Sequence, residues 1–185
     1  MKVKNTHIFS AQKADTLDGR IRRVLQNPFK ILTPYISDGM TVLDYGCGNG
    51  YFSIPLSKMV GNSGKVYSVD IQKEMLDKLA IKFTSLSISN ITMVNIGNEK
   101  LNLPVLLDFV IAVYVVHEIP DKNSFFKEIF DLLKPKGKLL IVEPDFIVSR
   151  RNFNRTLEIA KQTGFIEYEK LNLLFSKTRI LMKEE

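Results

Sequence analysis

The sequence predicts an α/β domain in which helices cover both faces of a doubly wound, mostly parallel, seven-stranded sheet. From about residue 28 onward, strand-like apolar runs alternate with helix-like runs whose apolar residues recur every three or four positions. Residues 109–116 are continuously apolar and rich in β-branched side chains, as in a strand buried on both faces of a parallel sheet. The last two apolar stretches are short and close together, which indicates an antiparallel hairpin at the C-terminal edge.

The first half of the chain supplies three strands and their helices. Residues 28–36 carry a helix-like apolar stripe that leads into a strand at 41–44. A glycine-rich turn follows, and then a helix over 51–60 and a strand over 65–70. In the next helix, over 72–83, Met75, Leu79 and Phe83 repeat at the i, i+4, i+8 spacing of one helix face. A third βα unit begins at Ile91.

The second half continues the alternation. After the strand at 109–116, Asp121 is placed to cap a helix that Pro135 and Gly137 end before a strand at 138–143. A helix over 150–162 is closed by Gly164, and strands at 165–169 and 173–182 form the antiparallel edge. The expected organisation is an N-terminal segment, residues 1–24, followed by one domain, residues 25–185.

The turn after the first strand has the composition of a ligand-binding loop. Gly46, Gly48 and Gly50 give G-x-G-x-G, which lets the backbone turn sharply and approach a ligand. A dinucleotide fingerprint, G-x-G-x-x-G, would need a glycine at Tyr51 and is not met. Asp44, two residues before the first glycine, would repel a pyrophosphate but attract a cation. S-adenosylmethionine carries both an ammonium and a sulfonium centre.

A second acid completes this pattern. Asp70 ends the next strand, where a carboxylate can accept hydrogen bonds from both hydroxyls of a ribose. Together with Asp44 and the glycines it resembles motif I and the following acidic position of class I S-adenosylmethionine-dependent methyltransferases. Three later segments resemble family motifs in the expected order: 95–99 the adenine-contacting segment, 132–144 the "LKPGG, LLIVEP" passage, and 163–168 the "GF" entry to the final hairpin. The resemblance covers roughly residues 25 to 183 and is greatest to the ubiquinone/menaquinone-biosynthesis-like subgroup.

The resemblance implies a Rossmann-like fold, S-adenosyl-L-methionine as cofactor, and a set of cofactor-binding positions. Asn98 stands where the family usually has Asp, so it can accept a hydrogen bond from the adenine amino group but adds no charge. Residues 1–24 are implied to fold over the cofactor, with Arg20, Arg22 or Arg23 meeting the methionine carboxylate, although a frayed tail is an equally good interpretation. The cofactor-binding residues implied are Asp44, Tyr45, Gly46, Gly48, Gly50, Asp70, Ile71, Gly97, Asn98, Glu99 and Val113.

His117 is the candidate catalytic residue. Methyl transfer from a sulfonium needs alignment more than a base, but a hydroxyl or an acidic carbon as acceptor would benefit from a base that titrates near neutrality. His117 lies just past the fourth strand, at the expected cofactor rim, with Tyr114 and Glu118 as neighbours. The alternative is a histidine that caps the following helix or bonds a loop. No metal is predicted, because Val113 and Tyr114 stand where a metal-binding acid would follow the strand.

The composition fits one ordinary domain. The chain has 185 residues, of which 45% are hydrophobic and 25% charged. Its longest apolar run, 109–116, is far below the roughly 20 residues that span a bilayer, and residues 1–10 have no apolar core typical of a signal peptide. The single cysteine, Cys47, fits a reducing compartment, and we interpret it as a packing residue. We therefore expect a cytoplasmic location.

The positive charge is concentrated in the flanks. The net charge is +6; residues 1–40 hold seven Lys/Arg against three acids, and residues 146–185 hold eight against five. This asymmetry can attract an acidic substrate, a nucleic acid or an anionic membrane. A solvated basic face is the preferred interpretation, because no run of adjacent basic residues exceeds two.

Three functions remain open from the sequence. The first, which is favoured, is a methyltransferase acting on a small-molecule acceptor such as a quinone or another lipid-like precursor. The second is RNA or protein methylation, which the basic flanks suggest. It predicts activity that falls steeply with salt. The third is a non-catalytic S-adenosylmethionine-binding partner of another chain. The oligomeric state and the acceptor atom are not predicted.

Overall fold

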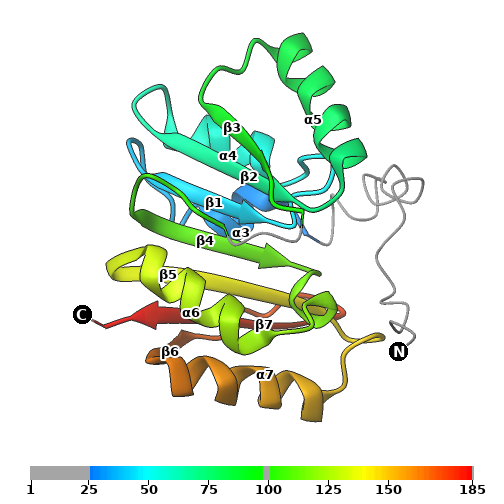
Figure 1. The fold of residues 1–185 in the computed structure, drawn as a ribbon, viewed down its shortest axis with the longest axis vertical. Coiled ribbons are helices and arrows are strands. Elements are labelled where there is room, and N and C mark those ends of the chain that lie inside the picture. The colour runs from blue at the N-terminus through cyan, green and yellow to red at the C-terminus, as the bar shows by residue number, and fades with distance from the viewer. Residues whose placement is uncertain (1–25, 98–100, 185) are drawn as a thin grey trace.

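The protein forms one seven-stranded sheet with helices on both faces (Figure 1). The structure is a computed structural model that describes residues 26–97 and 101–184. The elements are α3 (Pro28–Leu32), β1 (Thr41–Tyr45), α4 (Ser53–Val60), β2 (Lys65–Asp70), α5 (Lys73–Leu86), β3 (Ile91–Asn95), β4 (Leu107–Val113), the 3-10 turn η2 (Val116–Glu118), α6 (Lys122–Leu132), β5 (Leu133–Pro144), α7 (Arg150–Thr163), β6 (Phe165–Glu169) and β7 (Ser176–Lys183).

The strand order confirms the predicted doubly wound sheet. It runs β3-β2-β1-β4-β5-β7-β6, and β1 to β5 are parallel to their neighbours in that series. β7 pairs antiparallel with both β5 and β6, which is the expected C-terminal hairpin. The chain leaves β1 toward one edge through β2 and β3 and returns to the other side of β1 with β4. The strand order therefore reverses between β1 and β4, and ligands bind at this kind of switch point in open α/β sheets.

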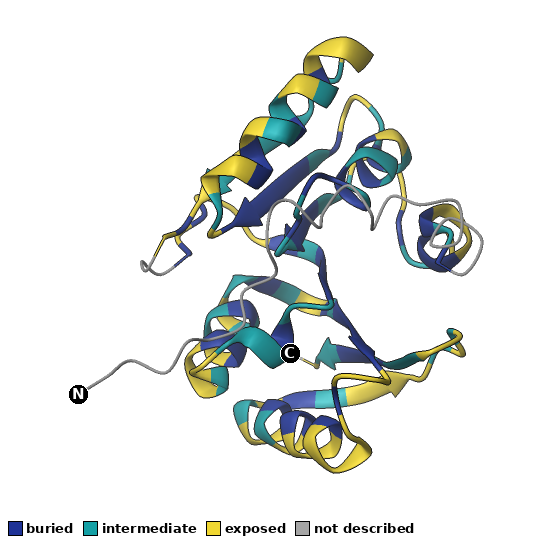
Figure 2. Cartoon of the chain, turned by 90° about the vertical axis from the view of Figure 1, so that its right-hand side faces the viewer, coloured by how far each residue is buried: buried dark blue, intermediate teal, exposed yellow. Residues whose placement is uncertain are grey.

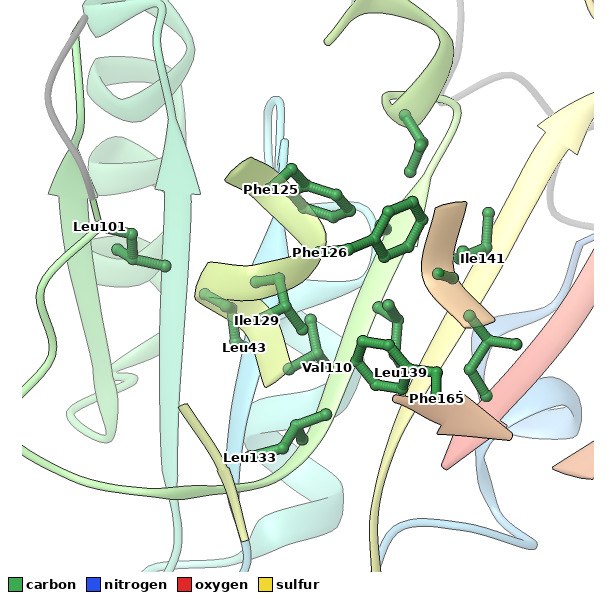
Figure 3. Close-up of a cluster of buried hydrophobic side chains, with 14 of the residues drawn as sticks. Leu43, Leu101, Val110, Phe125, Phe126, Ile129, Leu133, Leu139, Ile141 and Phe165 are labelled. Atoms are coloured by element: carbon green, nitrogen blue, oxygen red, sulfur yellow. The ribbon is translucent and has the colours of Figure 1, made fainter. Parts of the chain in front are cut away.

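Two hydrophobic clusters fill the space between the sheet and its helices. On one face, α6 and α7 contribute Phe126, Ile129 and Leu157 to a cluster that also contains Leu43 of β1 (Figure 3). The Phe126 ring is fully buried, with ring centroids of Phe125 and Phe165 at 5.1 and 6.1 Å. On the other face, α3 and α4 pack on a second cluster of strand residues. Burial on both faces explains why β4 has no polar face.

Several element bounds differ from the sequence prediction, each for a local reason. α3 ends at Leu32 and not at residue 36, because Pro34 has no N–H to continue the helix. β4 ends at Val113, because Tyr114 adopts a φ of 59°. β5 begins at Leu133, because that residue already pairs with Leu107 of β4.

The connection between β3 and β4 also departs from the predicted βα alternation. The described residues of this connection, 96–97 and 101–106, contain no helix. In the part of the chain that the structure covers, no helix is both long and apolar enough to cross a membrane.

Candidate active site

A cavity of about 1110 Å³ opens at the carboxyl ends of the parallel strands. These strands point to the right in Figure 1, and Figure 2 looks onto this end of the sheet. The ends of β1, β2 and β4 and the turns after them supply the wall at the switch point, and η2, α6 and the loop after β5 supply the rest. The volume is slightly above the roughly 300–1,000 Å³ that is typical of sites for one small molecule or cofactor.

The glycines of the turn after β1 have two different roles. Gly46, Gly48 and Gly50 have φ of 72°, 54° and 86°, which other residues rarely adopt. A Cβ at Gly46 would lie 2.6 Å from Val115 Cγ2, and one at Gly50 would lie 2.0 Å from Leu79 Cδ1, so a larger residue at either position would force a neighbouring side chain to shift. A Cβ at Gly48 would meet no atom within 4 Å.

Gly97, in the turn after β3, resembles Gly48. It has a φ of 50°, a Cβ there would also meet nothing within 4 Å, and both glycines line the cavity. The backbone at these two positions is therefore open to a ligand. Gly50 does not line the cavity, so the structure supports a packing role for it.

Two carboxylates lie at the carboxyl ends of the neighbouring strands: Asp44 is the last residue but one of β1, and Asp70 is the last of β2. Asp44 is buried, and its Oδ2 accepts a hydrogen bond of 2.6 Å from Ser53 Oγ at the start of α4. Asp70 accepts hydrogen bonds from the backbone N–H of Gly48 at 2.9 Å and of Gln72 at 2.8 Å. Both acids line the cavity.

Asp70 is tied to the glycine turn and yet retains acceptor capacity. Burial raises its pKa above the ordinary value, and hydrogen bonds from the backbone of Gln72, Gly48 and Ile71 oppose that shift. Each carboxylate oxygen has a second lone pair, so the bonds to the protein do not exhaust its capacity to accept from a ribose.

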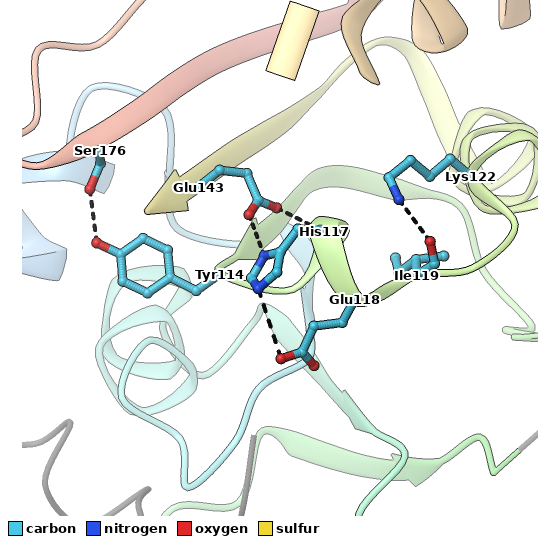
Figure 4. A network of polar contacts seen from close by, with 7 residues as sticks. All are labelled: Tyr114, His117, Glu118, Ile119, Lys122, Glu143 and Ser176. Atoms are coloured by element: carbon cyan, nitrogen blue, oxygen red, sulfur yellow. Dashed lines mark hydrogen bonds and ion pairs between the residues drawn. The ribbon is translucent and has the colours of Figure 1, made fainter. Parts of the chain in front are cut away.

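His117 forms a dyad with Glu143 at the end of β5 (Figure 4). The Nδ1 atom of His117 lies 2.5 Å from Glu143 Oε2, and the other oxygen, Oε1, accepts the backbone N–H of His117 at 3.1 Å. Because the carboxylate accepts, the imidazole proton lies on Nδ1, and in the neutral ring Nε2 carries the lone pair. Nε2 lies 3.9 Å from Glu118 Oε1.

The surroundings of His117 have opposing effects on its pKa. Burial lowers its pKa, but the hydrogen bond and charge of Glu143, together with the charge of Glu118, outweigh burial and raise the pKa above its ordinary 6.5. His117 is one-fifth exposed and lines the cavity, whereas Glu143 is buried. A histidine held in one tautomer by a buried carboxylate is the arrangement that general bases use.

Tyr114 follows β4 in a strained conformation. Its φ of 59° is unusual for an aromatic residue, and its hydroxyl lies 2.8 Å from Ser176 Oγ and accepts a hydrogen bond from Gln26 Nε2. These contacts hold the Tyr114 ring in place, and Tyr114 lines the cavity. Strain of this kind concentrates at functional sites.

The structure brings most of the sequence-predicted residues together. Asn98, Glu99 and residues 1–24 lie outside the described residues. Cys47 is a buried thiol that packs with Leu76 and Leu79, and burial raises its pKa, in agreement with a packing role. The predicted residues that line the cavity are Asp44, Tyr45, Gly46, Gly48, Asp70, Ile71, Gly97, Val113 and His117.

Glu143 is the site residue that sequence reasoning missed. It stands within the 132–144 segment, whose resemblance to a family motif assigns this carboxylate no role. Glu143 is the last residue but one of a buried strand. Asp70 is predicted as a site residue because it ends a strand, and the same pattern could have indicated Glu143.

The residues present fit a cationic nucleoside. Two buried carboxylates on adjacent strands offer negative charge and hydrogen-bond acceptors, and the Gly48 and Gly97 backbones leave room that a Cβ would fill. These features match the ammonium, sulfonium and ribose groups of S-adenosylmethionine.

Comparisons with known proteins agree with this fit. The family described as "Methyltransferase domain" matches residues 36–176. A ubiquinone/menaquinone biosynthesis C-methyltransferase of Pasteurella multocida is 34% identical over 131 residues, which is 70% of this chain and 48% of the relative. A demethylmenaquinone methyltransferase of Oceanobacillus iheyensis is 33% identical over 111 residues, which is 58% of this chain and 46% of the relative. The chain thus spans about half the length of these relatives.

A solved structure with the same fold covers the chain more completely. A methyltransferase from Aquifex aeolicus, described as dependent on S-adenosylmethionine, has a TM-score of 0.82 and 27% identity, and the match covers 95% of this chain and 100% of that one.

Proposed function

Because the chain belongs to the class I S-adenosylmethionine-dependent methyltransferases, of the ubiquinone/menaquinone-biosynthesis-like kind, we propose that it methylates a small, lipid-like acceptor that carries a hydroxyl or an acidic carbon. The observation that carries this proposal is the His117–Glu143 dyad, which lies at the same cavity as the two strand-end carboxylates. A base is useful only for an acceptor that must lose a proton.

The cofactor is assigned to the β1 and β2 side of the cavity. Asp70 would accept hydrogen bonds from the ribose hydroxyls, Asp44 would provide negative charge for the cationic end, and the open backbone at Gly48 and Gly97 would leave room for the ligand. When bound, S-adenosylmethionine supplies an electrophilic methyl group on a positively charged sulfur. The fixed carboxylates would orient that ligand toward the acceptor.

His117 is assigned the role of the base that removes a proton from the acceptor. The Nε2 lone pair accepts the proton of the acceptor, while Nδ1–H remains hydrogen bonded to Glu143. The resulting imidazolium is stabilised by the charge of Glu143, which is buried and cannot be screened well by solvent. Glu143 is a positioning residue in this scheme, because it acts through His117.

The relatives support a quinone-like acceptor. Their names refer to demethylmenaquinone and to ubiquinone/menaquinone biosynthesis. Apolar side chains that line the same cavity as His117, among them Ile119, Phe125 and Ile147, suit a ring with an apolar tail. We also place the reaction in the cytoplasm, since the single cysteine of the chain is a buried thiol.

A transfer assay tests the proposal. The purified chain is incubated with S-adenosylmethionine and the reduced form of a short-chain demethylmenaquinone, and the methylated product is measured by mass spectrometry. His117→Gln should lower kcat by roughly 10²–10⁴-fold with little change in S-adenosylhomocysteine binding. Lys73→Gln, at an exposed position of α5 that does not line the cavity, is the control and should keep full activity.

Two outcomes would overturn the proposal. Binding of S-adenosylmethionine without turnover of any quinol would favour a non-catalytic partner subunit. Methylation of RNA with a rate that falls steeply with salt would favour nucleic acid as the substrate.

A further inference from the structure

An exposed apolar patch lies at the mouth of the cavity. It consists of Phe146 and Ile147, in the loop after β5, and Leu174 and Phe175, in the loop before β7. The exposed fractions of these four residues are 80%, 53%, 63% and 65%. Phe146 and Ile147 also line the cavity, so the patch is continuous with the candidate active site. Neighbouring exposed rings and aliphatic chains at a site mouth mark an interaction surface.

The two loops that carry the patch are joined to each other by hydrogen bonds. The backbone N–H of Asp145 donates to Phe175 O at 3.0 Å, and Lys177 Nζ bonds Asp145 Oδ1 at 2.6 Å. At their bases, Pro144 pairs with Ser176 in the sheet. Both loops project at the right-hand end of the sheet in Figure 1. Phe175 has a φ of 56°, so a strained backbone holds an aromatic ring out in solvent.

Basic side chains lie close to this patch along the chain. Arg150 and Arg151 begin α7, three residues after Ile147, and Lys170 precedes the second loop. All three are exposed, and none forms an ion pair with another described residue. The first turn of α7 contains no acid, although helix dipoles favour acids at this end. The one carboxylate within the loops, Asp145, is neutralised by Lys177.

We propose that this patch docks on the surface of an anionic lipid bilayer, with the rings of Phe146 and Phe175 in the headgroup region and the arginines on lipid phosphates. Aromatic and aliphatic side chains beside arginine and lysine are the combination that binds such interfaces. The cavity mouth then faces the membrane, and a lipid-like acceptor enters without crossing water. This last consequence rests on the proposed function, whereas the docking itself does not.

A tryptophan probe tests insertion directly, because the chain contains no tryptophan. Phe175→Trp places a single fluorophore in the patch, and Ile81→Trp places one at a similarly exposed position on α5 as the matched control. Vesicles of phosphatidylcholine with roughly one third phosphatidylglycerol should shift the emission of the Phe175→Trp variant to the blue, and brominated lipid should quench it. The emission of the control variant should not change.

Vesicle sedimentation measures the contribution of each part. Leu174→Ser with Phe175→Ser, and separately Arg150→Gln with Arg151→Gln, should each weaken binding by about tenfold or more. Lys30→Gln with Lys58→Gln removes the same charge from α3 and α4 and should have little effect. Binding should also fall with added salt and be weak to pure phosphatidylcholine. S-adenosylhomocysteine binding by each variant confirms that it is folded, since none of these positions lines the cavity.

Three results would overturn the proposal: no vesicle binding, binding that the patch variants leave unchanged, or emission changes equal at positions 175 and 81. A dimer in solution that Leu174→Ser with Phe175→Ser dissociates would assign the patch to a second copy of the chain instead. Vesicle binding needs neither cofactor nor acceptor. A failure here therefore leaves the methyl-transfer proposal untouched, and a failure of the transfer assay leaves docking untouched.

Discussion

Replacing Gly48 with alanine should separate cofactor binding from folding. Gly48 has a φ of 54°, where an alanine costs roughly 1–2 kcal/mol. Its new Cβ would meet no protein atom within 4 Å, so no packing cost is added. We therefore expect the free energy of unfolding to fall by about 1–2 kcal/mol, which a domain of ordinary stability tolerates.

The effect on binding should be larger in relative terms. The new methyl group occupies space against which we place the cofactor, and a misfit of one methyl in a packed contact costs roughly 1–3 kcal/mol. Since 1.4 kcal/mol is a factor of ten, affinity for S-adenosylhomocysteine should weaken about 5- to 150-fold. Calorimetric titration of the folded variant measures this change.

Gly50→Ala is the matched control two residues away. Its φ is 86°, and its Cβ would lie 2.0 Å from Leu79 Cδ1, so overpacking of roughly 1–3 kcal/mol adds to the backbone cost. Urea unfolding should therefore show a larger loss of stability than for Gly48→Ala. If folded Gly48→Ala binds S-adenosylhomocysteine as tightly as the parent chain, the ligand does not lie against Gly48 and the assignment is wrong.

Four further predictions concern single contacts. Glu143→Gln should lower the pKa of His117, because the change removes the charge that raises this pKa and leaves burial, which lowers it; NMR titration of the two histidines measures the shift. The stability that the dyad contributes is fully present below the ordinary histidine pKa of 6.5 and is lost as pH rises through the raised pKa, so the difference in unfolding free energy between parent and Glu143→Gln should shrink over that interval. Ser53→Ala removes the hydroxyl that donates to buried Asp44 and should cost about 1–3 kcal/mol in urea unfolding. Phe126→Ala empties a fully buried position and should cost about 3–5 kcal/mol; a loss below about 1 kcal/mol would contradict the packing described for α6.

Local chemistry explains which parts of the fold the sequence predicts well. The strand at 109–116 is recognisable because burial on both faces leaves no polar position, and Asp121 caps α6 as predicted through its bond from Ser124 N–H. The residue at which that strand ends depends on a contact with a distant part of the chain. Tyr114 leaves the strand conformation with its hydroxyl anchored to Ser176, 62 positions away in the chain.

The same distinction holds for the site. Asp70 and His117 are recognisable because each closely follows or ends a predicted strand at the carboxyl edge. The pairing of His117 with Glu143 depends on β4 and β5 being neighbours, which the order of elements along the chain does not state. The roles of Gly48 and Gly50 differ only because Leu79 of α5 packs beside one of them.

Calorimetric titration with S-adenosylmethionine and S-adenosylhomocysteine, with NADH as the competing ligand, tests the central claim most directly. The parent chain and Asp77→Asn, an exposed carboxylate on α5, should bind both sulfur compounds equally well. Asp70→Asn keeps one acceptor oxygen but loses the charge, and its affinity should fall by roughly tenfold or more. No binding by the parent chain, equal binding by Asp70→Asn, or binding of NADH instead would contradict the assignment of this cavity to S-adenosylmethionine.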